Sequence, residues 1–175
     1  MMKKQNRSRI LIAAIALCLI MAACGKGEPA PTGGFGEKDL GIAIGGQTYY
    51  LREDSAALIS ALGDDYEYSE VVSCVYDGKD KTFEYDGITI GTVPVDGKDL
   101  IEVITLTRDS YATLRGARVG DSLDTVKSLY GENFFDDGYL TYSLSADIED
   151  IHSERIQFEY SGDTVTRIFI YSPSY

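Results

Sequence analysis

The stretches DSLDTVKSLYG at residues 121–131 and DSAALISALG at residues 54–63 decide the fold of this chain. Both open with Asp-Ser, a typical helix N-cap, and both close with a glycine, where a helix end favours a left-handed residue. In the later stretch, four apolar residues share one helical face: Leu123, Val126, Leu129 and Tyr130. Each predicted helix has only about ten residues, so it must pack on another element to be stable.

Strand signals follow each predicted helix. Runs of apolar alternation predict strands at residues 71–76, 82–85, 88–93, 100–107, 139–144, 156–160 and 165–171. Hairpin turns are expected at 77–78, 86–87, 96–97 and 161–162, where Asp-Gly or Ser-Gly stands. A weaker pair of strands, 42–44 and 48–51, precedes the first helix. Because parallel crossovers need a helix for every strand, the pattern predicts an antiparallel α+β domain with both helices on one sheet face.

Two landmarks recur in the same order along the chain. One is the helix pattern, and the other is FEYDG at residues 83–87, which returns as FEYSG at residues 158–162. Landmarks that repeat in order predict a tandem repeat of one helix-plus-strands unit. We expect one domain over residues 39–175, with copies at about 40–107 and 112–172.

The first 24 residues have the pattern of a bacterial lipoprotein signal. Basic residues at positions 3, 4, 7 and 9 precede an uncharged run, residues 10–23, which is too short to span a bilayer. Small residues before Cys24 match a lipobox, so we expect cleavage after residue 23 and attachment of diacylglycerol and acyl chains such as palmitate to Cys24. An ordinary secretory signal or a longer membrane anchor are the alternatives. Residues 24–38 are expected to form a flexible tether that holds the domain at the extracytoplasmic face of the cell membrane.

The net charge of the chain limits the kinds of molecule that it can bind. The chain has 16 basic and 28 acidic residues, and removing the signal, with its 4 basic residues, leaves 12 against 28, a net charge of -16. Such a chain is repelled by phosphate backbones, so nucleic acid is not expected as a partner. With Cys18 in the signal and Cys24 lipidated, Cys74 has no intramolecular disulfide partner, and the domain must be stable through its core.

Several segments resemble lipoproteins of Gram-positive bacteria whose activity is uncharacterised. They are residues 114–122 with Val126 and Tyr130-Gly131, residues 73–81, and residues 85–90 followed by Pro94. The helix-then-sheet repeat is also similar to the fold of the β-lactamase inhibitor protein (BLIP) and of the outer-membrane-assembly lipoprotein BamE. The resemblance covers residues 40–172 and implies a BLIP-like fold and an anchored location. It does not imply inhibition of β-lactamase, because this chain cannot form the inhibitor's disulfides and has no match to its inhibitory loops.

The sequence contains no pattern that predicts catalysis. Cys74 lacks Lys, Arg or His within four residues, so we expect a buried apolar thiol, with intermolecular disulfide or redox use as the alternative. His152 is the single histidine and lies in a polar stretch, which favours a surface position over a zinc site or a triad. The acidic loops do not match calcium-loop spacing. We therefore expect no enzyme activity, no cofactor and no bound metal.

Aromatic residues after the two helices are the candidate binding residues. The chain has 13 Tyr and 6 Phe but no Trp, and five aromatic residues lie outside strict strand alternation: Tyr66, Tyr68, Phe134, Phe135 and Tyr139. Exposed aromatic rings are typical of protein interfaces, whereas the alternative is that they cap the sheet. We expect a protein-binding module that uses these loops or the sheet face. A sensor of a small ligand or cation is the second hypothesis.

Overall fold

The computed structural model describes residues 30–145, 147 and 149–173. The elements up to the middle of the chain are a 3-10 helix Glu37–Asp39, β1 Gly41–Ile44, β2 Gln47–Tyr50, α1 Ala56–Leu62, β3 Glu67–Val72, β4 Lys79–Tyr85, β5 Ile88–Val95 and β6 Lys98–Leu106. The later elements are α2 Leu123–Tyr130, β7 Phe135–Asp136, β8 Leu140–Ser143, β9 Arg155–Ser161 and β10 Thr164–Tyr171. The predicted antiparallel α+β class is confirmed.

Both helices are capped near the predicted residues. Ser122 Oγ accepts a hydrogen bond of 3.1 Å from the backbone N–H of Thr125 at the start of α2. At α1 the accepting side chain is Asp54, which lies 3.1 Å from the N–H of Ala56, while Ser55 makes no side-chain cap. Gly63 and Gly131 end the two helices with φ values of 92° and 89°. These positive angles explain why glycine is needed at both ends.

The main sheet has eight strands in the order β3-β4-β5-β6-β10-β9-β8-β7, and β1 pairs with β2 separately. Since residues directly opposite each other share a face, the strand register defines rows that cross the sheet. One such row is apolar and buried from β5 to β8: Ile90, Ile104, Ile170, Ile156 and Tyr142. We call this side the core face.

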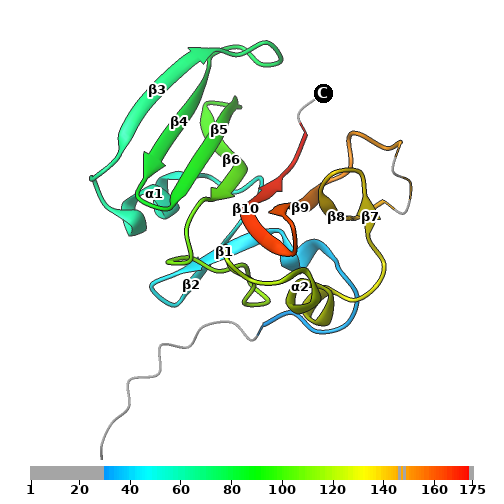
Figure 1. The fold of residues 1–175 in the computed structure, drawn as a ribbon. Coiled ribbons are helices and arrows are strands. Elements are labelled where there is room, and N and C mark those ends of the chain that lie inside the picture. The colour runs from blue at the N-terminus through cyan, green and yellow to red at the C-terminus, as the bar shows by residue number, and fades with distance from the viewer. Residues whose placement is uncertain (1–29, 146, 148, 174–175) are drawn as a thin grey trace, which may run out of the picture.

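Both helices and the β1–β2 hairpin pack on the core face. Leu58 of α1, Val126 of α2 and Ile42 of β1 are fully buried in the same cluster as the core-face row. These three elements lie along the lower side of the sheet in Figure 1, whereas the β3–β4 turn lies at the top. The opposite side, which we call the outer face, keeps several side chains partly exposed, including Thr89, Thr105, Gln157 and Phe169.

Three sequence predictions need correction. The first strand after α1 is Glu67–Val72 rather than residues 71–76, because the chain turns at residues 73–78. β7 has no counterpart among the predicted strands. The FEYDG and FEYSG segments also lie in different positions, since the first belongs to the second strand after α1 and the other to the third strand after α2. They are therefore not equivalent landmarks.

Candidate interaction surface

The five candidate aromatic residues do not form one cluster. Tyr66 and Phe134 are partly buried against the core, where their rings lie 5.3 Å from Tyr85 and 6.0 Å from Tyr142. This packing favours the alternative that they cap the sheet. Tyr68 lies on the edge strand β3, and this tyrosine is 48% exposed. Thr141 lies on the outer face, opposite Gln157. Phe135 lies directly opposite Thr141, and Tyr139 precedes Thr141 by two residues, so both belong to the outer face.

The outer face gathers these two residues with aromatic residues of β10. The rings of Tyr139 and Phe169 meet edge to face with centroids 6.3 Å apart. Tyr171 lies two residues after Phe169 on the same face, and its hydroxyl donates to Gln157 Oε1 at 3.1 Å. We call Phe135, Tyr139, Phe169 and Tyr171, together with Arg155 and Arg167, the outer aromatic cluster. The sequence pattern does not single out Phe169, Tyr171 or either arginine as surface residues.

Each arginine of the outer aromatic cluster stacks on a ring. The guanidinium carbon of Arg167 lies 5.7 Å from the centroid of Phe169, and that of Arg155 lies 5.8 Å from the centroid of Tyr171. Arg167 also pairs with Glu159 at 3.3 Å. Arg155 is only 8% exposed and already donates from Nε and Nη2 to the carbonyls of Ser153 and Asp150, whereas the Arg167 side chain is 49% exposed and presents its stacked guanidinium at the surface. The outer aromatic cluster therefore combines ordered rings with ordered cations in a chain that is otherwise strongly acidic.

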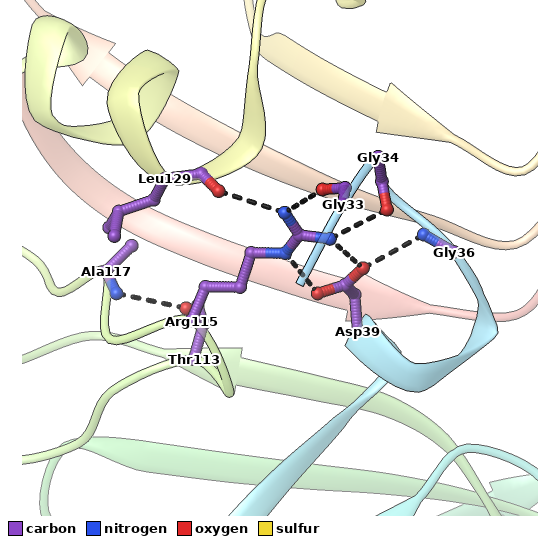
Figure 2. A network of polar contacts seen from close by, with 8 residues as sticks. All are labelled: Gly33, Gly34, Gly36, Asp39, Thr113, Arg115, Ala117 and Leu129. Atoms are coloured by element: carbon purple, nitrogen blue, oxygen red, sulfur yellow. Dashed lines mark hydrogen bonds and ion pairs between the residues drawn. The ribbon is translucent and has the colours of Figure 1, made fainter. Parts of the chain in front are cut away.

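The N-terminal segment is fixed to the domain by Arg115, so the predicted tether is wrong for residues 33–38. Arg115 donates five hydrogen bonds: from Nε and Nη2 to Asp39 at 2.6 and 2.8 Å, and to the carbonyls of Gly33, Gly34 and Leu129 at 2.7, 2.8 and 3.0 Å (Figure 2). A guanidinium has five N–H donors, so all are used. The Arg115 and Asp39 side chains are 5% and 1% exposed, and their hydrogen bonds raise the pKa of Arg115.

A surface hollow of about 540 Å³ lies beside this contact, lined by residues of the N-terminal segment with Thr48, Tyr50, Leu114 and Arg115. Its size falls in the range of small-ligand pockets. The cations that line it are Lys38 and Arg115, and protein acceptors already use all the N–H groups of the Arg115 guanidinium. The hollow thus lacks a free guanidinium donor with which to hold an anionic ligand.

The β3–β4 hairpin exposes residues that the sequence placed in a strand. Cys74 is exposed in the turn between β3 and β4, so the prediction of a buried thiol is wrong. The reason is that β3 ends at Val72, two residues before the cysteine. Val71, Val72 and Val75 are also exposed, at 66%, 76% and 52%.

Residues considered for chemistry lie apart from one another. His152 is exposed in the β8–β9 connection, which confirms the predicted surface position. Within the described part of the chain, no three His, Cys, Asp or Glu side chains are grouped as a metal site would need. None of the described helices is long and apolar enough to cross a membrane. Cys24, the predicted lipid attachment site, lies outside the described residues.

Comparisons of this chain with models of known protein families, with curated proteins and with solved structures give no match.

Proposed function

We propose that this chain is a non-catalytic, membrane-anchored module that binds another extracytoplasmic protein through the outer face of its sheet. The observation that carries this proposal is the outer aromatic cluster, in which two aromatic–arginine stacks stand beside a Tyr–Phe pair. Aromatic residues and arginine are the types most enriched among residues that dominate binding energy at protein interfaces. Tyr139 and Phe169 pack on each other outside the core, so they contribute surface rather than fold.

The lipid on Cys24 remains part of the proposal. Eight residues lie between Cys24 and Gly33, the first residue that Arg115 holds, and the nine steps from one to the other span at most about 30 Å when fully extended. The Arg115 contact therefore shortens the free tether expected from the sequence. In Figure 1 the described chain begins at the bottom, while the β3–β4 turn lies at the top, so the anchored domain would present that turn away from the membrane.

We also propose that the domain is a tandem repeat of one helix followed by four strands, in a BLIP-like arrangement. The helix regions support a shift of 68 residues: Asp54, Gly63 and Tyr66 correspond to Ser122, Gly131 and Phe134. The hydroxyl of Tyr85 donates to the carbonyl of Gly63 at 3.2 Å, and that of Tyr142 donates to Gly131 at 2.8 Å. The second strand after each helix thus contacts the end of that helix in the same way.

The start of each helix supports the same relation. The N–H of Ile101 in β6 donates to the carbonyl of Glu53, and the N–H of Val165 in β10 donates to that of Asp121, both at 2.9 Å. Around the β6–β10 pair, Ile104 lies opposite Ile170, while Leu106 lies opposite Ile168. A two-fold axis that passes between Thr105 and Phe169 exchanges these two pairs. With this axis, the two halves of the sheet would be related by two-fold rotation, and the outer aromatic cluster would lie beside the centre.

The binding proposal is tested with the full-length lipidated chain in its own membranes. Chemical cross-linking followed by affinity capture is compared for the parent chain, for a Tyr139→Ala/Phe169→Ala variant and for Ile151→Ala. Ile151 is 60% exposed in the β8–β9 connection and serves as the matched control. The proposal expects one specific adduct that the double variant loses and the control keeps. Equal capture by all three chains would contradict the use of the outer face.

A further inference from the structure

We infer that the free edge of β3 is a second binding site, which accepts an extended segment of a partner protein carrying a basic residue at one end and apolar residues at the other. β3 stands at the end of the eight-stranded sheet, and all six of its residues are exposed. An exposed edge strand can pair with an added strand through its backbone. This site lies on another part of the molecule from the outer aromatic cluster and does not depend on it.

The register shows which backbone groups face the open edge. Ser73 donates its N–H to the carbonyl of Gly78 at 3.1 Å, in the position that continues the β3–β4 pairing. Because alternate residues of an antiparallel pair bond across to the partner strand, the odd-numbered residues of β3 face β4. The N–H and C=O groups that face the open edge then belong to Tyr68, Glu70 and Val72.

The side chains of β3 define the chemistry of the added segment. Glu67 lies directly opposite Glu84 on the outer face, and both are exposed. Like charges directly opposite each other destabilise a sheet, and a cation on a neighbouring strand would compensate the repulsion between these two carboxylates. At the other end, Val71 and Val72 are exposed and fit apolar residues. A second copy of this acidic chain, with 28 acidic against 16 basic residues, is a poorer match than a basic segment.

The matching probe follows from the register. A segment antiparallel to β3 would read apolar, apolar, polar, polar, aromatic, basic, because Glu70 already pairs with Lys79 while Glu67 faces Glu84, and the hexapeptide Val-Val-Thr-Thr-Tyr-Lys has this pattern. Val-Val-Thr-Thr-Tyr-Glu is the charge-reversed control. Binding of the labelled peptides to the full-length chain in detergent micelles is measured by fluorescence anisotropy, and hydrogen exchange over residues 67–72 locates the site. We expect the lysine peptide to bind at least tenfold more tightly than the control and to slow exchange in β3.

Three variants separate strand addition from misfolding. Glu67→Lys removes the like-charge pair, so it should raise the thermal midpoint of the domain while weakening the lysine peptide at least tenfold. Val72→Pro removes one N–H that faces the open edge without touching the β3–β4 bonds, and Val72→Thr keeps that N–H. Of the two Val72 variants, only the proline variant should lose binding. Unchanged binding by Glu67→Lys, absence of protection in β3, or dimerisation of the chain through this edge would overturn the inference.

Discussion

Removing either partner of the Arg115–Asp39 pair should destabilise the whole domain. The pair is buried, and Arg115 also holds the carbonyls of Gly33, Gly34 and Leu129. Asp39→Ala leaves a buried guanidinium without its counter-charge, which costs about 3–5 kcal/mol in comparable sites. Since single domains unfold with about 5–15 kcal/mol, the loss is a large part of the total.

Urea unfolding followed by circular dichroism measures this loss, and hydrogen exchange at residues 33–36 reports release of the N-terminal segment. The double variant Asp39→Leu/Arg115→Met should cost no more than either single change, because no uncompensated charge remains. Lys81→Ala is the control, since the Lys81–Asp99 pair is 28% and 34% exposed and should contribute at most about 1 kcal/mol. If Asp39→Ala costs no more than this control, the assigned role of Arg115 is refuted.

Three further predictions concern the helices, pH and Cys74. Ser122→Ala should cost about 1 kcal/mol in urea unfolding, because it removes the α2 cap, whereas Ser128→Ala should cost less. Burial raises the pKa of Tyr85 and of Tyr142 from 10.0 to about 12, so the free energy of unfolding should be highest below pH 10 and fall as pH rises toward 12. The fall should be smaller in Tyr85→Phe/Tyr142→Phe, and a free energy of unfolding that does not change over this pH range would contradict the prediction. Iodoacetamide should modify Cys74 in the folded chain nearly as fast as in urea, and protection would contradict its exposure.

Much of the fold could be predicted from alternation and caps, because those signals are local. β9 and β10 have buried residues at alternate positions, such as Ile156 with Phe158 and Ile168 with Ile170, and the sequence places both strands well. β3 could not be placed in this way. All of its residues are exposed, so its two faces do not differ in polarity.

The fixed N-terminal segment was hidden from sequence reasoning for a different reason. Arg115 and Asp39 are 76 residues apart, and glycines around Asp39 favour the interpretation of a flexible tether. No local pattern indicates that one arginine will bond to two of those glycine carbonyls.

The candidate surface could be predicted only in part. Phe135 and Tyr139 lie outside alternation, whereas Phe169 and Tyr171 lie inside an apolar strand and resemble core residues. The alternation of side chains along a strand carries the signal: when Ile168 and Ile170 are buried on one face, Phe169 and Tyr171 must point to the other face. Tyr66 and Phe134 were misleading, because loop residues three positions after a helix-ending glycine return to pack on the core.

Site-specific photo-cross-linking in living cells tests the binding proposal most directly. A photoreactive residue replaces Thr105, which lies beside Phe169 on the outer face, or Ala57, which is exposed on α1 on the opposite side of the sheet. The proposal predicts a discrete protein adduct from position 105 and none from position 57. No adduct from position 105, or the same adduct from both positions, would contradict a protein-binding outer face.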